Sequence, residues 1–329
     1  MRAVRVRQPG GPESIELVEV DDPVPGSDEL LVSVAVAGVN YVDTYHRAGI
    51  YPKDPPFGLG LEGVGTVRKV GPGVAGFSVG ERVAWCDVPN SYAELVTVPA
   101  GRAVRVPGDI PDELAVGALL QGMTAHCLVD STYPVAPGDS ILVHAAAGGV
   151  GLLLTQLAAG RGARVIGTVS TEEKAELARG AGAAEVIRYD QTKDLATEVR
   201  ALTGGQGVPV VYDGVGRTTF DASLASLRRR GTMVLFGAAS GRVPPVDPQR
   251  LFTGGSLYLT RPSLYDYIHT REELEHHANA VFGAVADGTL DIRVGHRYSL
   301  AEAGQAHEDL QARRTTGKLL LRVTTLTRR

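Results

Sequence analysis

The chain has 329 residues, of which 43% are hydrophobic and 21% charged, a composition typical of a globular protein with room for two domains. Its formal net charge of −4 gives no bulk attraction to anionic membranes and makes nucleic acid an unfavourable partner. The N-terminal residues lack the apolar core of a signal peptide, and no apolar run reaches the length of a membrane span, so we expect a cytoplasmic protein.

Residues 1–120 are rich in Val, Gly and Pro, and short apolar runs such as residues 30–40 alternate with turn-forming residues. This pattern predicts an antiparallel, barrel-like β domain. The only cysteines of the chain are Cys86 and Cys127, too few for a disulfide framework or a four-cysteine metal site. We expect both to be buried, reduced thiols.

From about residue 120 onward, apolar strands alternate with segments of helical length. The predicted strands are residues 140–145, 164–169, 185–189, 208–213, 232–237 and 256–260, and the predicted helices are residues 149–160, 171–180, 192–203 and 218–229. Strand and helix in regular alternation indicate a doubly wound α/β domain with a parallel sheet.

The last part of the chain does not continue this alternation. Thr270 and Glu273 have the spacing of a capping box at the start of a long helix, and a second helix near residues 300–313 precedes a strand at 318–323. We expect these elements to pack back on the first domain. The predicted division is therefore 1–122 for the β domain, 123–262 for the α/β domain and 263–329 for the return.

A glycine-rich turn follows the first strand of the α/β domain. Residues 144–151, HAAAGGVG, have the spacing Ala146-x-Gly148-x-x-Gly151, which is a dinucleotide-binding turn with its first Gly replaced by Ala. Such a turn lets the backbone and the N-terminus of a helix hold a pyrophosphate. A plain tight turn between strand and helix is the alternative, and the surrounding βαβ pattern favours the dinucleotide site.

The end of the second strand indicates which dinucleotide is bound. An NAD site needs an acidic side chain there for the ribose 2′-hydroxyl, whereas this chain has Ser170, with Lys174 one helical turn later and Tyr189 at the end of the next strand. NADP(H) is therefore favoured over NAD(H). In the alternative interpretation Ser170 and Glu173 form only a capping box and Lys174 is a surface lysine.

Several longer motifs resemble one known family. In chain order they are AGVNYVDTYHRAGIYP, HAAAGGVG, GTVSTEEK, VVYDGVG, LFGAASG, GSLYLTRPSL and TTGKLLL. Together they resemble the zeta-crystallin-like quinone oxidoreductases of the medium-chain dehydrogenase/reductase superfamily. The resemblance covers nearly the whole chain and implies a GroES-like β-barrel catalytic domain wrapped around a Rossmann domain, with the active site in the cleft between them.

The same resemblance implies a set of NADPH-binding residues. The pyrophosphate would lie on Gly148, Gly149, Val150 and Gly151, and the 2′-phosphate near Ser170, Lys174 and Tyr189. The remaining cofactor-binding positions that it implies are Asn40, Thr124, Gly214, Phe236, Gly237, Arg261 and Lys318.

The resemblance also argues against a metal. Zinc-dependent members of the superfamily have a Cys near the position of Asn40 and a G-H-E-x-x-G stretch, whereas residues 60–65 of this chain keep Glu62 but have Leu61 in place of the His. Neither the three ligands of a catalytic zinc nor the four of a structural zinc are present in these motifs. We therefore expect a zinc-free enzyme, for which alcohol oxidation is unfavourable.

The expected reaction is the transfer of a hydride, or of single electrons, from NADPH to a quinone. Asn40, Tyr45 and Tyr51 are the candidate catalytic residues, since an amide or hydroxyl group can stabilise or protonate the reduced oxygen; each Tyr is equally compatible with a packing role. Two alternatives stay open: an NADPH-dependent alkenal, enone or enoyl reductase, and a non-enzymatic NADPH-binding protein of crystallin-like or RNA-binding type. The apolar edge strand at 256–260 predicts a homodimer.

Overall fold

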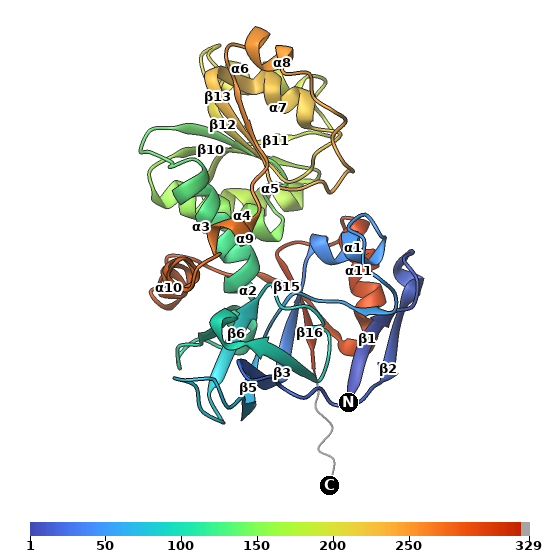
Figure 1. Ribbon diagram of the computed structural model, residues 1–329. Helices are drawn as coiled ribbons and strands as arrows, with labels where there is room; N and C mark the ends of the chain where they lie inside the picture. The colour runs from blue at the N-terminus through green and yellow to red at the C-terminus, as the bar shows by residue number, and fades with distance from the viewer. Residues whose placement is uncertain (324–329) are drawn as a thin grey trace. The chain divides into compact units, whose positions relative to one another are not determined.

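The computed structural model describes residues 1–323 and divides into two compact units (Figure 1). Unit 1 comprises Met1–Leu120, Ile268–Gly288 and the chain from Ile292 onward, and unit 2 comprises Gln121–Tyr267 and Thr289–Asp291. The predicted limits were 122/123 and 262/263, whereas the two units divide after Leu120 and after Tyr267 and include a short return to unit 2 at Thr289–Asp291. That return has a local cause, because the Asp291 N–H donates to Gln156 Oε1 (2.7 Å) and Gln156 Nε2 donates to the Asp291 carbonyl (3.0 Å).

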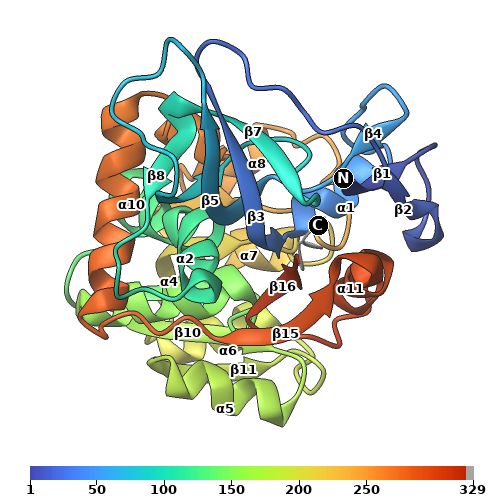
Figure 2. The same ribbon diagram turned by 90° about the horizontal axis from the view of Figure 1, so that it is seen from below.

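Unit 1 is built on two sheets. The larger has seven strands in the order β15-β16-β3-β5-β6-β8, with β7 also paired to β3; the smaller has the order β2-β1-β4. Every pairing in them is antiparallel except β15 with β16, and Figure 2 shows β3 beside β5. The strand bounds are β1 (Arg2–Val6), β2 (Ile15–Glu19), β3 (Glu29–Val39), β4 (Phe57–Gly58), β5 (Glu62–Val70), β6 (Arg82–Cys86), β7 (Leu95–Pro99), β8 (Ala103–Arg105), β15 (Val294–Ser299) and β16 (Lys318–Arg322).

The tail of the chain completes the larger sheet. Strand β16 runs antiparallel to β3, with Leu319 opposite Val39 and Leu321 opposite Ala37. The last strand of the tail thus belongs to the sheet of unit 1. The helices of this unit are η1 (Pro12–Ser14), α1 (Tyr41–Arg47), η2 (Ala100–Arg102), α2 (Asp112–Gly117), α10 (Arg271–Ala286), η5 (Leu300–Glu302) and α11 (Ala303–Gln311). Helix α10 starts with the predicted capping box of Thr270 and Glu273.

Unit 2 is a six-stranded parallel sheet in the order β11-β10-β9-β12-β13-β14, which is the 3-2-1-4-5-6 order of dinucleotide-binding folds. Its strands are β9 (Ser140–Val143), β10 (Arg164–Val169), β11 (Ala183–Arg188), β12 (Val208–Asp213), β13 (Leu227–Leu235) and β14 (Tyr258–Thr260). The predicted α/β domain with a parallel sheet is therefore confirmed.

Helices cover both faces of this sheet. In Figure 1, α4 and α5 lie on one face and α6 and α7 on the other. The bounds in this unit are η3 (Ala118–Met123, entered from unit 1), α3 (Thr124–Cys127), η4 (Leu128–Thr132), α4 (Gly149–Gly160), α5 (Glu172–Gly180), α6 (Leu195–Leu202), α7 (Phe220–Ser226), α8 (Gln249–Thr253) and α9 (Leu264–Tyr267).

Strand β13 is the element that sequence patterning placed least well. The predicted helix ran to residue 229 and the predicted strand began at 232, but β13 already begins at Leu227. Leu227 pairs with Val208 and Thr232 pairs with Val210, so the ladder shifts register across the intervening arginines. Arg230 takes a left-handed φ of 57° inside this irregular stretch. A run of three exposed arginines carries no alternating pattern, and the strand start was therefore missed.

Both cysteines are buried free thiols, as expected. Among residues 1–323, no helix combines the length and apolar character that crossing a membrane requires.

Candidate active site

The turn from β9 to α4 has the geometry of an anion-binding loop. Gly148 caps α4, its N–H donates to the Ala145 carbonyl (2.8 Å), and no acidic residue lies in the first helical turn. The turn requires glycine at Gly151, because a Cβ there would lie 2.2 Å from the Ala145 oxygen. The left-handed residue is Ala145, with φ of 51°. The N–H groups at the start of α4 are thus available for a phosphate ligand, next to the switch point between β9 and β12.

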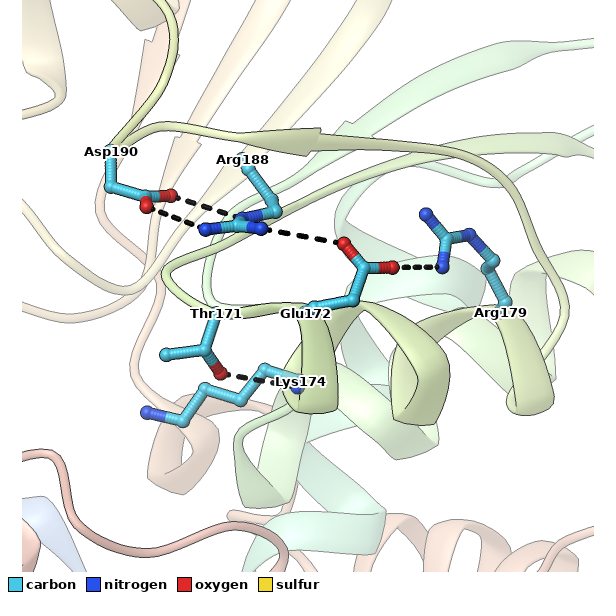
Figure 3. A network of polar contacts seen from close by, with 6 residues as sticks. All are labelled: Thr171, Glu172, Lys174, Arg179, Arg188 and Asp190. Atoms are coloured by element: carbon cyan, nitrogen blue, oxygen red, sulfur yellow. Dashed lines mark hydrogen bonds and ion pairs between the residues drawn. The ribbon is translucent and has the colours of Figure 1, made fainter.

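The turn from β10 to α5 brings the predicted 2′-phosphate residues together. Lys174 Nζ lies 3.4 Å from Ser170 Oγ, and the Tyr189 N–H donates to the carbonyl of Val169, the last residue of β10 (3.1 Å). Tyr189 is exposed. The capping residue of α5 is Thr171, whose Oγ1 accepts from the Lys174 N–H (3.3 Å; Figure 3). The alternative capping box of Ser170 with Glu173 is therefore wrong, and the Ser170 hydroxyl faces an ammonium group instead.

A buried carboxylate that sequence reasoning missed organises the ends of β12 and β13. Asp213 accepts from the N–H groups of Val215 and Gly216 and from the hydroxyls of Thr219 and Ser223, at 2.7–2.9 Å. Its position as the last residue of a fully buried strand, β12, was the available signal. Gly214 and Gly237 adjoin there, since a Cβ on Gly237 would lie 2.4 Å from the Gly214 oxygen.

The other predicted cofactor residues of unit 2 lie on separate segments. The Phe236 N–H donates to the Asp213 carbonyl (2.9 Å), next to Gly237. Thr124 begins α3 and is half-buried, whereas Arg261 follows β14 and is exposed. No hydrogen bond within the described residues links Thr124 or Arg261 to Phe236.

Asn40, Glu62 and Lys318 form a buried polar cluster in unit 1. Their exposed fractions are 3%, 0% and 1%. Asn40 Nδ2 donates to Glu62 Oε1 (2.5 Å), and Lys318 Nζ donates to Asn40 Oδ1 (3.0 Å) and forms an ion pair with Glu62. Because the amide nitrogen of Asn40 faces an acceptor and its amide oxygen faces a donor, the orientation of the Asn40 amide is fixed.

Three elements position this cluster. Asn40 caps α1 directly after β3, Glu62 begins β5 and Lys318 begins β16. A Cβ on Gly38 would lie 2.2 Å from Glu62 Oε1, so a glycine in β3 makes the room for the carboxylate. The Leu120 N–H donates to Glu62 Oε2 (3.0 Å), which leaves both carboxylate oxygens hydrogen-bonded.

Asp43 lies directly beside the cluster. Its Oδ2 accepts from the Asn40 N–H (2.8 Å) and from the Tyr92 hydroxyl (2.9 Å), while Oδ1 has no hydrogen-bond partner among the described residues. Burial raises the pKa of Asp43 to about 7, and those two hydrogen bonds oppose the rise only in part. Near neutral pH this carboxyl group therefore holds or releases a proton one turn from Asn40.

The predicted tyrosines pack against each other on and after α1. The ring centroids of Tyr45 and Tyr51 are 5.3 Å apart in an edge-to-face arrangement, and Tyr41 packs on Tyr45 at 5.7 Å. Tyr45 is buried and Tyr51 half-buried. The structure thus brings Tyr51, which follows α1, against Tyr45 on the helix that Asn40 caps.

Comparison with known proteins finds matches over nearly the whole chain. A family model described as alcohol dehydrogenase GroES-like domain matches residues 26–108, and one described as zinc-binding dehydrogenase matches residues 149–279. A quinone oxidoreductase of Pseudomonas aeruginosa is 44% identical over 95% of this chain and 96% of its own length. A 2-haloacrylate reductase of a Burkholderia species is 42% identical over 97% of this chain and 98% of its own.

A solved structure of Escherichia coli quinone oxidoreductase complexed with NADPH has a TM-score of 0.96. It is 42% identical and covers 98% of this chain and 100% of its own.

The residues of this chain do not fit the zinc ion that the second family description names. Within the described residues, no group of three or more His, Cys, Asp and Glu side chains could hold a metal. The Glu62 carboxylate is bound by Lys318, Asn40 and Leu120, and the neighbouring Leu61 offers no donor atom.

Proposed function

Because this chain belongs to the quinone oxidoreductase family, we propose that it catalyses the reduction of quinones by NADPH. When bound, NADPH supplies a hydride from its nicotinamide ring. One observation carries the cofactor assignment: the end of β10 presents Ser170 and the Lys174 ammonium where an NAD site has a carboxylate. A positive charge there complements a 2′-phosphate.

The protein's own part is binding and orientation. The turn Gly148–Gly151 is proposed to hold the pyrophosphate, with the N–H groups of the first residues of α4, Gly149 to Gly151, as donors. Ser170, Lys174 and Tyr189 are proposed to hold the 2′-phosphate. The segment around Gly214, Phe236 and Gly237, which the hydrogen bonds of Asp213 hold, is proposed to line the rest of the dinucleotide site. The cofactor contacts predicted for Asn40, Thr124, Arg261 and Lys318 stay predictions.

Reduction of a quinone places negative charge on one of its oxygens. We propose that the Asn40 amide, held in one orientation by Glu62 and Lys318, stabilises that charge. Tyr45 or Tyr51 is proposed to deliver the proton. Charge stabilisation and proton delivery would thus both come from side chains on or next to α1.

Steady-state kinetics with NADPH and NADH test this proposal. With 1,4-benzoquinone and 9,10-phenanthrenequinone as acceptors, the protein should oxidise NADPH in preference to NADH. Lys174→Ala should raise the KM for NADPH and leave that for NADH unchanged, whereas Lys69→Ala, which removes an exposed lysine in β5 of unit 1, should change neither. Equal effects of Lys174→Ala on both cofactors would contradict the 2′-phosphate assignment, and absent turnover on every quinone would contradict the reaction.

A second acceptor class has specific support. The 42% identical relative is named for reducing a 2-haloacrylate, which is an activated carbon–carbon double bond rather than a quinone. Including 2-chloroacrylate and an enone in the same assay separates the two functions. A higher kcat/KM for the alkenes would replace the quinone with an activated alkene as the preferred substrate.

We also propose that the protein is a cytoplasmic homodimer that joins its six-stranded sheets. Among the described residues, the edge strand β14 pairs with β13 alone, and the exposed fractions of Tyr258 and nearby Phe252 are 61% and 70%. An apolar, unpaired edge favours pairing with a second copy. Tyr258→Arg should yield a monomer in sedimentation velocity, whereas Val79→Arg at another exposed apolar residue should not. A monomeric wild type would refute this.

A further inference from the structure

The start of α5 carries a charge that opposes the proposed cofactor. Glu172 and Glu173 form the acidic first turn of this helix, directly after Ser170 and the capping Thr171. A carboxylate beside a phosphate dianion is repulsive, and the helix N-terminus attracts both groups. A site for NADPH in this place therefore needs a means of neutralising the nearer carboxylate.

The structure contains such a means on the neighbouring elements. The two carboxylate oxygens of Glu172 contact different arginines. Oε1 accepts a hydrogen bond from Arg179 Nη1 (2.8 Å), and Oε2 accepts one from Arg188 Nη1 (3.5 Å). The hydrogen bond from Arg179 is the largest cause of a lowered pKa of Glu172, so this side chain stays ionised and paired. Arg179 comes from the end of α5 and Arg188 from the end of β11.

Arg188 is itself held from the other side. Its Nη2 and Nε donate to the two carboxylate oxygens of Asp190, at 2.8 and 3.3 Å. Figure 3 shows the resulting row of alternating charges, Arg179, Glu172, Arg188 and Asp190. In the same view the Glu172 carboxylate points toward the two arginines. The Lys174 side chain extends past Thr171, away from the Glu172 carboxylate.

From this arrangement we infer that Arg188 determines cofactor selectivity through Glu172. Arg188 holds the carboxylate of Glu172 against β11 and balances its charge. This pairing reduces the repulsion between Glu172 and the 2′-phosphate that Ser170 and Lys174 are proposed to bind. Arg188 is a positioning residue and does not itself contact the cofactor. The inference rests on the proposed function, because it concerns how the NADPH site of unit 2 discriminates against NADH.

The test is direct binding of the reduced cofactors, followed by nicotinamide fluorescence at low ionic strength. Arg188→Ala should weaken NADPH binding by roughly threefold to tenfold, as expected for exposing one carboxylate to a phosphate dianion at the surface, and leave NADH binding unchanged. Added salt should shrink the difference. Arg250→Ala, which removes an exposed arginine paired with Asp221 elsewhere in unit 2, is the matched control and should change neither affinity.

The double variant Arg188→Ala/Glu172→Gln separates the proposed mechanism from a direct contact. If Arg188 acts through Glu172, neutralising the glutamate restores NADPH affinity to the wild-type value. NADPH affinity that stays low in the double variant, or that is unchanged in Arg188→Ala, overturns the inference. A wild-type protein that binds both cofactors equally would instead overturn the NADPH assignment, which keeps the two failures distinct.

Discussion

Removing the ammonium group of Lys318 should destabilise unit 1 severely. Lys318→Met keeps most of the side-chain stem but leaves the Glu62 carboxylate, whose exposed fraction is 0%, without a counter-charge. The Asn40 amide and the Leu120 N–H still donate to it, yet neither carries a charge. Breaking a buried ion pair from one side costs about 3–5 kcal/mol, so the free energy of unfolding should fall by that amount.

Trp85 makes the measurement specific to unit 1. It is the only tryptophan of the chain, it is fully buried, and it lies opposite Gly63 in the pairing of β6 with β5, next to Glu62. Urea unfolding followed by its fluorescence therefore reports the unit that contains the cluster. Lys318→Met should lower the midpoint with little change in the slope of the transition.

A second substitution distinguishes charge from packing. In Lys318→Met/Glu62→Gln, both charges are gone, and the Asn40 amide can turn to accept from the new side-chain amide. The double variant should therefore regain most of the lost stability. A loss below about 1 kcal/mol in the single variant, or a double variant less stable than the single, would refute the assignment of a coupled buried pair.

Three further predictions concern single side chains. The folded pKa of Asp43, about 7, lies above its ordinary 3.8, so protonation stabilises the fold at low pH and that stabilisation, of order 4 kcal/mol, is lost as pH rises through 7. Asp43→Asn should flatten the pH dependence of the urea midpoint between pH 4 and 8; an unchanged profile would contradict this. Gly151→Ala, which brings a Cβ to 2.2 Å from the Ala145 oxygen, should cost about 1–3 kcal/mol and weaken NADPH binding in calorimetry; unchanged stability and affinity would contradict the need for glycine there. Asn40→Ala should lower kcat more than NADPH affinity, with exposed Asn279→Ala as control; unchanged turnover would remove Asn40 from the chemistry.

Periodicity predicted most of unit 2 because its elements are local and regular. The predicted bounds of the strands at 164–169 and 208–213 and of the helix at 149–160 match β10, β12 and α4 residue by residue. Periodicity did not identify the capping residue of α5. Ser170 and Thr171 are both good capping residues, and the helix begins after the second of them.

The ionic contacts of the site were beyond sequence reasoning because they join distant segments. Asn40 and Lys318 are 278 residues apart and meet only through the pairing of β3 with β16. Their side chains were singled out by resemblance, and nothing in their spacing indicates that Glu62 binds both. Arg188 was missed for a similar reason, since its pairing with Glu172 depends on the alignment of β11 beside β10.

The two polar arrangements lie in different units, and this separation has a consequence for variants. The cluster of Asn40, Glu62 and Lys318 lies wholly in unit 1, whereas Ser170, Lys174 and Arg188 lie in unit 2. Because the two sets belong to separate compact units, we expect substitutions in one set to act independently of the other. Substitutions in the unit 1 set should thus change turnover and preserve the preference for NADPH over NADH. Substitutions in the unit 2 set should change that preference and preserve turnover. A double variant of Asn40→Ala and Lys174→Ala whose effects on kcat/KM do not multiply would show that the two sets are coupled.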